Sequence, residues 1–202
     1  MRRGRLEDVA SLSQSLARAF KDDPIASYIF PEPERRTEYL RRFFTLQLRH
    51  NYLPRGEVFT TDAQQAASLW MPPRARPPRL RDRLAHVWFA PLLGERLSAT
   101  RRLTQLLEAN HPVVPHYYLG TLGTDPAHQG RGLGTALLGP VLARCDDAGL
   151  PIYLECSLLE NVAFYARQGF RVTAEVHAPD AGPPLWLMWR EPKDAVGPAP
   201  RA

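Results

Sequence analysis

The sequence predicts a single α/β (α+β) domain in which short strands and helices alternate around one core. Three observations predict this class. Strand-like apolar runs alternate with segments of helical periodicity along the chain. A glycine-rich turn at residues 129–135 joins one such strand to one such helix. The 202 residues, 44% of them hydrophobic, suffice for one globular domain, which we expect at residues 1–191, followed by a disordered Pro/Ala-rich tail at 192–202.

Each element is expected from its own local pattern. Apolar residues every three or four positions predict a helix, alternation predicts a strand, and Pro72 and Pro73 end the first hairpin. In chain order, the expected elements are a short or missing first strand at residues 2–5, helices at 6–20 and 34–50, strands at 57–61 and 66–71, a helical insertion at 79–110 that is a candidate substrate cap, a strand at 116–122, a helix at 132–148, a strand at 151–156, a helix at 161–168, and strands at 170–176 and 185–190.

The glycine-rich turn at residues 129–135 (QGRGLGT) is the strongest functional signal. It lies between a strand and a helix N-terminus, an order that presents backbone N–H groups and the positive end of a helix dipole to an anion. Its glycines lack the Cβ atoms that would keep a ligand's oxygens away from the backbone. The turn therefore predicts a pyrophosphate site, with a tight turn that binds nothing as the alternative.

Two other nucleotide-binding motifs fit less well. The turn lacks the Gly-Lys-Ser/Thr ending of a P-loop, which excludes that motif. It also does not open the first strand–helix unit of the chain, as a dinucleotide-binding fingerprint does. This second exclusion is weaker, because Glu155 lies about twenty residues further on, where such a fingerprint has its acidic residue.

Two motifs after the turn complete a family resemblance. Residues 150–157 (LPIYLECS) predict a buried strand, and residues 161–170 (NVAFYARQGF) predict a short helix closed by glycine. Gln-x-x-Gly-x-Gly, then this strand, then Asn-x-x-x-Tyr-x-x-x-Gly-Phe, resembles the GNAT acyltransferase superfamily, and is closest to puromycin N-acetyltransferase-like enzymes. The resemblance is specific over residues 116–191 and loose before them.

The resemblance implies a fold and a cofactor. The fold is a mixed, mostly antiparallel sheet of about six to seven strands, flanked by helices and splayed near residues 122–124, where Gly123 would allow a bulge. The cofactor is acetyl-CoA, with its pyrophosphate on the glycine-rich turn and its pantetheine arm in the splayed cleft. The implied cofactor-binding residues are Leu122, Gly123, Thr124, Gln129, Gly130, Arg131, Gly132, Leu133, Gly134, Thr135, Asn161 and Phe164.

Tyr165 is the candidate general acid. Acyl transfer to an amine requires deprotonation of the amine and protonation of the leaving thiolate, and a phenol with a reference pKa near 10 is protonated at neutral pH. The alternative is a core tyrosine with a satisfied hydroxyl. Asn161, one turn earlier, would also serve as a helix N-cap. The sequence shows no Ser-His-Asp or Cys-His constellation, which favours direct attack by the amine.

Glu155 is the candidate general base, because it interrupts an otherwise apolar strand and burial raises the pKa of a carboxyl group. A structural carboxylate paired with an arginine is the equal alternative. Cys156 points to the opposite face of a regular strand and is not expected to be a nucleophile.

The acceptor site is the least defined. Its candidates, each of which also fits plain core or surface, are Asp22, Asp23, Tyr28, Phe30 and Trp70, with Trp88 and Phe89 as a further aromatic wall.

Composition narrows the partners. The formal net charge is +5 and arises almost entirely from dispersed arginines with acidic neighbours, so we expect no nucleic-acid surface. Cys145 and Cys156 are expected in the core, and no spacing suggests a metal site. No apolar run approaches the roughly twenty residues of a membrane span, and no leader is visible, so a cytoplasmic monomer or homodimer without a membrane partner is expected.

Three functions remain at this stage. The first is an N-acetyltransferase that acetylates a primary amine of a small molecule, such as an aminonucleoside or related antibiotic. The second is a protein or peptide N-acetyltransferase. The third is a catalytically silent acyl-CoA-binding regulatory module on the same fold. The presence of both Glu155 and Tyr165 argues against the third.

Overall fold

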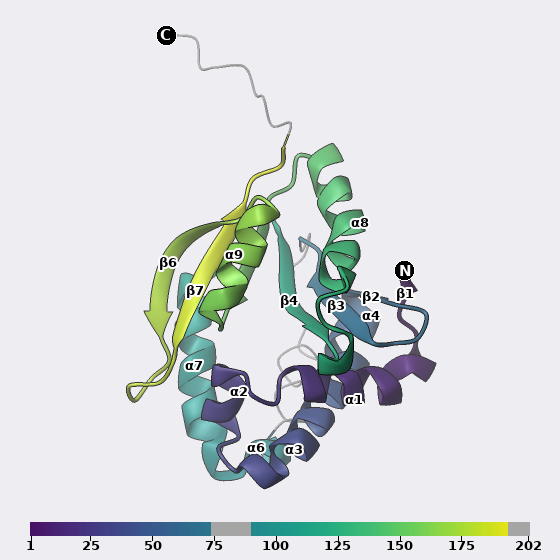
Figure 1. Ribbon diagram of the computed structural model, residues 1–202. Coiled ribbons are helices and arrows are strands. Elements are labelled where there is room, and N and C mark those ends of the chain that lie inside the picture. The colour runs from purple at the N-terminus through teal and green to yellow at the C-terminus, as the bar shows by residue number, and fades with distance from the viewer. Residues whose placement is uncertain (74–89, 194–202) are drawn as a thin grey trace.

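The computed structural model describes residues 1–73 and 90–193, and within them one mixed sheet runs through the centre of the molecule (Figure 1). Its order is β1-β2-β3-β4-β5-β7-β6, and every described neighbour pair is antiparallel except β4 with β5. This confirms the predicted mixed, mostly antiparallel sheet. The strands are β1 (Arg2–Arg3), β2 (Glu57–Thr60), β3 (Ala66–Met71), β4 (Tyr117–Thr124), β5 (Ile152–Cys156), β6 (Arg171–His177) and β7 (Pro184–Arg190).

Helices cover both faces of this sheet. They are α1 (Val9–Ala19), α2 (Pro24–Ile29), α3 (Pro33–Leu46), which continues as a π-helical segment at Gln47–Tyr52, α4 (Leu53–Arg55), α6 (Ala90–Leu93), α7 (Leu97–Asn110), α8 (Leu133–Asp147) and α9 (Leu159–Arg167). Short 3₁₀ turns lie at Leu6–Asp8, Gly94–Arg96 and Pro126–His128. The part of the predicted insertion at 79–110 that is described, residues 90–110, is helical; its beginning and the tail from residue 194 lie outside the described residues.

Two apolar cores hold the layers together. On one face, α1 and α3 pack on β2 and β3 through residues such as Leu12, Phe44 and Leu69. On the other, α8 and α9 pack on β4, β5 and β7. Leu69 and its neighbour Trp70 lie in different cores, as the alternation of side chains along a strand requires. A smaller cluster joins α2 and α7 to the β6–β7 end of the sheet.

Helix α2 was not predicted. The Asp22-Asp23-Pro24 segment, which follows the helix predicted at 6–20, begins a new helix. Asp23 accepts a hydrogen bond from the Ala26 amide (2.9 Å) as the N-cap residue, and Pro24 occupies the first helical position. Both residue types favour a helix start. The chain between α1 and α3 is therefore a short helix over the sheet, where a loop was expected.

The sheet splits at its centre. Strand β4 pairs with β5 only from Tyr117 to Leu119, although β4 continues to Thr124 and β5 to Cys156. Beyond that point β4 remains paired with β3, and β5 with β7. The predicted splay is thus present, and it begins at Gly120, before the predicted residues 122–124 (Figure 1).

The bulge lies at Gly120 and not, as predicted, at Gly123. Leu69 pairs with Thr121 and Trp70 with Leu119, so Gly120 is the extra residue. A Cβ atom at Gly120 would lie 1.9 Å from the Tyr52 hydroxyl, which leaves no room for a side chain. Gly123 has a different role, because a Cβ there would lie 2.7 Å from the Leu16 Cδ2 atom of α1. It allows α1 to pack closely on the strand.

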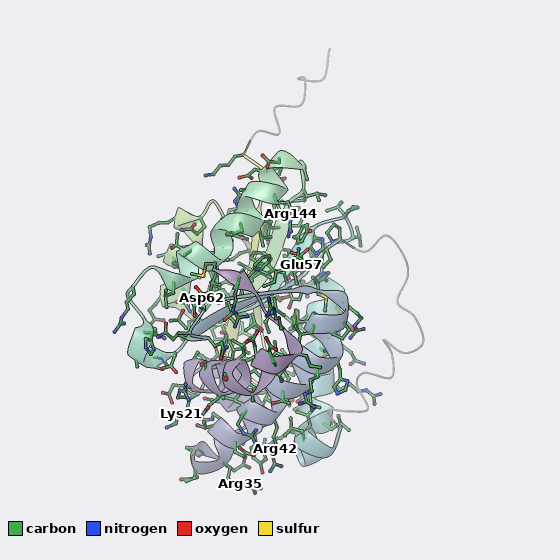
Figure 2. All side chains as sticks on the ribbon, turned by 90° about the vertical axis from the view of Figure 1, so that its right-hand side faces the viewer. Lys21, Arg35, Arg42, Glu57, Asp62 and Arg144 are labelled. Atoms are coloured by element: carbon green, nitrogen blue, oxygen red, sulfur yellow. The ribbon has the colours of Figure 1, made fainter. Side chains whose placement is uncertain are left out.

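The arginines in the described part of the chain lie on both helices and strands, and many of them face carboxylates. Arg41 and Arg42 both bond to Glu38 at 2.8 Å, and Arg144 of α8 bonds to Glu57 of β2 at 2.5 Å. Figure 2 shows Arg144 beside Glu57, and Arg42 at the far end of the molecule. The expected lack of a nucleic-acid surface stays a prediction.

Candidate active site

The glycine-rich turn has the geometry of an anion site. Gly130 and Gly132 have φ angles of 75° and 74°, and Gly132 is the N-cap of α8 without a side-chain cap. From Gly130 onward, the first amide with a backbone acceptor is that of Ala136, bonded to the Gly132 carbonyl at 3.0 Å. The amides of residues 130–135 therefore form a cluster of free donors at the start of a long helix, as a phosphate group requires.

The turn is open on the side where a ligand would approach. A Cβ atom at Gly130 or Gly132 would meet nothing within 4 Å, so packing is not what requires glycine there. The left-handed backbone requires it. The residues present thus fit the pyrophosphate of acetyl-CoA.

Side chains hold this turn against the end of β4. Gln129 donates its amide N–H to the Thr124 carbonyl (3.2 Å), and Asp125 accepts from the Ala127 amide (3.1 Å) and from Arg18 Nε of α1 (2.7 Å). Burial opposes ionisation of Asp125, but the Arg18 and Ala127 hydrogen bonds lower the pKa of its carboxyl group below the usual value. Arg131 is exposed and donates to the Ala127 carbonyl (3.4 Å).

Three predicted cofactor positions from distant parts of the chain meet next to this turn. A Cβ atom at Gly134 would lie 3.3 Å from Phe164 Cζ and 3.8 Å from Leu122 Cδ2. Because these residues belong to α8, α9 and β4, the three elements converge at the mouth of the split between β4 and β5 (Figure 1). The glycine at position 134 lets the α9 aromatic ring approach the first turn of α8.

Tyr165 lies on α9, in the core beneath α8 and α9. Its ring contacts Phe164 (centroids 5.1 Å apart) and Phe170 (5.8 Å), and its hydroxyl has no hydrogen bond among the described residues. Burial, and to a smaller extent nearby Cys156, raise the pKa of this phenol above its usual value. The phenol is therefore protonated at neutral pH, and its role as the general acid stays a prediction.

Asn161 is not the N-cap of α9. The helix begins at Leu159, two residues earlier than predicted, with Leu158 as the cap residue and no side-chain cap. Asn161 lies in the first turn, exposed to solvent. Of the two suggested roles, only the cofactor contact stays open as a prediction.

Glu155 lies directly after the last residue pair that joins β5 to β4. Its Oε2 atom accepts a hydrogen bond from the Tyr118 hydroxyl at 2.7 Å, and its Oε1 atom lies 3.9 Å from His111 Nδ1. The side chain is 8% exposed. No arginine pairs with it among the described residues, so the alternative of an arginine-bound structural carboxylate does not hold there.

The candidate acid and base face opposite sides of the split sheet. Leu154 and Cys156 belong to the core that contains Tyr165, so Glu155, between them on the strand, points to the other face. The Glu155 carboxylate and the Tyr165 phenol thus lie on opposite faces of the sheet, and their roles as base and acid stay predictions.

The five acceptor candidates do not form one surface. Trp70 is fully buried, and Phe30 is buried with its ring stacked on Tyr39 at 5.4 Å. Tyr28 is half-buried with a hydroxyl that has no partner in the described part of the chain. Asp22 is exposed. Trp88 and Phe89 lie outside the described residues.

Asp23 joins α2 to the end of β5. It is buried, caps α2, and accepts a hydrogen bond from the Ser157 hydroxyl, just beyond β5. Burial raises the pKa of this carboxyl group, against the opposing effect of the Ser157 and Ala26 hydrogen bonds. The contact brings the α1–α2 connection to the mouth of the split.

No pattern in the sequence indicated that three further side chains lie near Glu155. Tyr118, His111 and His116 come from the β4 strand and the segment before it, and their spacing to Glu155 matches no motif. Only the parallel pairing of β4 with β5 brings them together.

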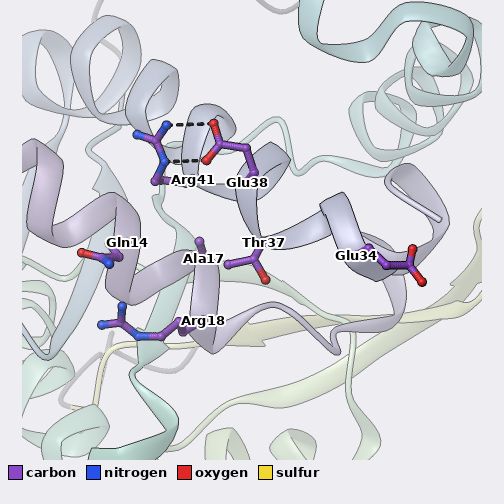
Figure 3. A pocket seen from close by; sticks show the side chains of 7 residues that line it. All are labelled: Gln14, Ala17, Arg18, Glu34, Thr37, Glu38 and Arg41. Carbon is purple, nitrogen blue, oxygen red and sulfur yellow. Dashed lines mark hydrogen bonds and ion pairs between the residues drawn. The ribbon is translucent and has the colours of Figure 1, made fainter. Parts of the chain in front are cut away.

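A separate groove of about 480 Å³ lies between α1 and α3 (Figure 3). It shares no residue with the predicted active site. Glu38 and Arg41, both of α3, are hydrogen-bonded to each other in one of its walls. The lining residues are Gln14, Ala17, Arg18, Glu34, Thr37, Glu38 and Arg41.

The split mixed sheet and the open glycine-rich turn at the start of α8 are features expected of an acyl-CoA-dependent acyltransferase. The model of the acetyltransferase (GNAT) family matches residues 47–170, more than half of the chain. The chain belongs to this family and is an enzyme that transfers acetyl groups, for which the family's donor is acetyl-CoA.

Relatives and solved structures agree with this assignment. The chain is 27% identical to an uncharacterized N-acetyltransferase of Schizosaccharomyces pombe over 95% of its own length and 83% of that protein. It shares its fold with a structure described as histone acetyltransferase HPA2 and related acetyltransferase from Corynebacterium glutamicum (TM-score 0.69, 24% identity, 97% of both chains). An agmatine N-acetyltransferase also shares it (TM-score 0.64, 18% identity, 94% of this chain and 98% of that one). The narrower resemblance to puromycin N-acetyltransferase-like enzymes stays a prediction.

Two further findings concern partners. No helix in the described ranges has the length and apolar character needed to cross a bilayer. Within the same ranges, histidine, cysteine and carboxylate side chains nowhere gather in threes suited to a metal ion.

Proposed function

We propose that this enzyme transfers the acetyl group of acetyl-CoA to a primary amine of a small molecule, by direct attack of the amine in a ternary complex. The observation that supports this most is the split between β4 and β5, with Glu155 on one face and Tyr165 on the other. Acetyl-CoA supplies the activated acyl group. The free amides of residues 130–135 would hold its pyrophosphate, and Leu122, Asn161 and Phe164 would line its pantetheine arm.

The proposed roles of Glu155 and Tyr165 follow from the surroundings of each side chain. Glu155 accepts a proton from the acceptor ammonium, so that the amine has a free lone pair for attack. Tyr165 donates its phenolic proton to the departing thiolate. Beyond Leu119, the edge of β4 has no strand partner on its β5 side within the described sheet, which leaves backbone N–H groups available to an oxyanion.

A small acceptor is favoured over a protein chain. The Glu155 side chain is only 8% exposed, and the ring of His111 lies against its neighbour Tyr118 at a centroid distance of 5.2 Å. A slender amine reaches such a carboxylate more readily than a folded surface does. Among proteins of this fold, two are named for acting on agmatine or polyamines, both cationic amines. The negative charge of the Glu155 carboxylate would complement the positive charge of such an amine.

A panel of amines tests the proposal. Release of free CoA is measured with polyamines, agmatine, arylalkylamines, aminonucleosides and aminoglycosides, and with peptides carrying a free N-terminus or lysine. Mass spectrometry locates the added acetyl group. We expect turnover of at least one small amine and poor turnover of peptides. A preference for peptides would contradict the proposed acceptor class, and acetyl-CoA binding without any turnover would favour the silent module.

A further inference from the structure

Two histidines lie near Glu155 and have no role in the proposed reaction. His111 directly follows α7, and His116 directly precedes β4. The His111 Nε2 atom lies 3.1 Å from His116 Nε2, and His116 Nδ1 lies 2.7 Å from the Val114 carbonyl oxygen. The other ring nitrogen of His111, Nδ1, lies 3.9 Å from Glu155 Oε1. These contacts form a continuous row from the Glu155 carboxylate to the backbone of residue 114.

The hydrogen bonds fix the proton on each ring nitrogen. A carbonyl oxygen only accepts, so His116 carries its proton on Nδ1 and presents a bare Nε2. His111 must then donate from Nε2, which leaves its own Nδ1 bare and facing Glu155. Both Glu155 Oε1 and His111 Nδ1 thus have lone pairs. Because 3.9 Å exceeds a direct hydrogen bond, one bridging water or a small side-chain shift would connect them.

Of the groups around Glu155, His111 is the one suited to pass a proton to solvent. The tyrosines that face Glu155 are held protonated, because burial and then the Glu155 charge raise the pKa values of Tyr52, Tyr118 and Tyr153. The Tyr118 hydroxyl already occupies Glu155 Oε2. Burial is also the main cause that lowers the pKa of His116, which keeps this ring a neutral acceptor. His111, with a side chain 36% exposed, is the member of the row with ready access to water.

We infer that His111 carries the proton of the acceptor amine from Glu155 to solvent, and that His116 holds His111 in the tautomer this requires. The inference rests on the proposed role of Glu155 as the base. The N–H bond of the ammonium breaks as an O–H bond forms on Glu155. This O–H bond then breaks as an N–H bond forms at His111 Nδ1, and the imidazolium releases that proton to bulk water. The base is thereby reset for the next turnover. Neither histidine touches the substrate.

His111→Gln is the informative variant. The glutamine side-chain N–H can replace the Nε2–H donor to His116, but glutamine has no basic atom for Glu155. We expect kcat to fall about tenfold, less than the ~10²–10⁴-fold typical of losing the base itself, with KM for both substrates unchanged. The kcat of His111→Gln should rise again as the buffer concentration increases, and added imidazole should partly restore the kcat of His111→Ala. The matched control is His177→Gln on the exposed strand β6. An unchanged kcat without buffer or imidazole dependence would overturn the relay.

A measurement without turnover separates this inference from the proposed function. Long-range ¹H–¹⁵N spectra of the whole chain should show His111 protonated on Nε2 and His116 on Nδ1. The His111 Nδ1 signal should shift in Glu155→Gln but not in Glu175→Gln, a carboxylate that contacts His177 instead. The opposite His111 tautomer, or no response to Glu155→Gln, would refute the relay even if acetylation is confirmed. Failure of all amines to react would refute the proposed function, but the tautomers of His111 and His116 could still be measured and interpreted.

Discussion

Gly132 and Gly149 offer a matched pair of substitutions at the two ends of α8. Both have a left-handed backbone, with φ angles of 74° and 63°, and a Cβ atom at either would meet nothing within 4 Å. Replacement by alanine therefore imposes the same backbone strain without a clash. Only Gly132 belongs to the turn with free amides at the helix N-terminus.

The expected magnitudes separate stability from binding. A left-handed alanine costs about 1–2 kcal/mol, so both Gly132→Ala and Gly149→Ala should lose that much stability. For a chain of this length, this corresponds to about 2–8 °C in Tm. At position 132 the methyl group also projects into the open side of the turn. Losing one hydrogen bond to a charged phosphate costs about 1.5–3 kcal/mol, which weakens acetyl-CoA binding by about 10- to 150-fold.

Calorimetric titration of acetyl-CoA, with thermal unfolding of the same samples, provides the assay. Gly132→Ala should lose affinity and Gly149→Ala should keep it, although both unfold at a similarly lowered temperature. Equal affinity in the two folded variants would refute the placement of the pyrophosphate. A loss in both would show that affinity follows stability and not contact with the turn.

Three further predictions concern the reaction and the fold. Tyr165→Phe should lower kcat by about 10²–10⁴-fold in steady-state assays while acetyl-CoA affinity stays constant, because the ring still packs and only the proton is lost; wild-type turnover with chemistry rate-limiting would remove Tyr165 from the mechanism. Glu155→Gln should be most impaired at low pH, where the amine is protonated, and recover as pH rises; a deficit independent of pH would argue against a base. Asp146 accepts two hydrogen bonds of 2.7 Å from Arg190, which is 1% exposed, and these bonds lower the pKa of its carboxyl group. Because the folded-state pKa is lowered, the ionised Asp146 carboxylate stabilises the fold at pH values above its unfolded-state pKa, and this stabilisation is lost as the pH falls through the folded-state pKa. In urea unfolding, the free energy of unfolding of Asp146→Asn should therefore be about 3–5 kcal/mol lower than that of the wild type at pH 7. In acid the two proteins should be close in stability.

The strand–turn–helix unit around residues 117–147 is determined by the sequence itself. Its signals are local: an apolar run, glycines in the left-handed conformation, and helical spacing after them. The start of α8 was predicted to within a residue because Gly132 and the first apolar residue, Leu133, are neighbours. The short helix α9 and the two strands that follow it along the chain were also predicted, because their signals are likewise local.

Local signals failed where one pattern has two meanings. Asp-Pro after α1 ends one helix and begins α2, and the sequence does not distinguish these outcomes. Gly123 looked like the bulge because a glycine often marks one, but the close approach of α1 is the reason for glycine there. The bulge at Gly120 depends on pairing with a strand about fifty residues earlier.

Everything about how the active site works depends on tertiary contacts. The sequence identified Glu155 and Tyr165 as candidates, but their placement on opposite faces of the sheet follows from the packing of α9 against Leu154 and Cys156 of β5. The hydrogen bond between Tyr118 and Glu155 joins residues 37 positions apart. Burial assigned Trp70 and Phe30 to the core and left Asp22 at the surface. A side chain's type can be read from the sequence, but its neighbours, and with them its charge state and partners, are determined only when distant segments pack together.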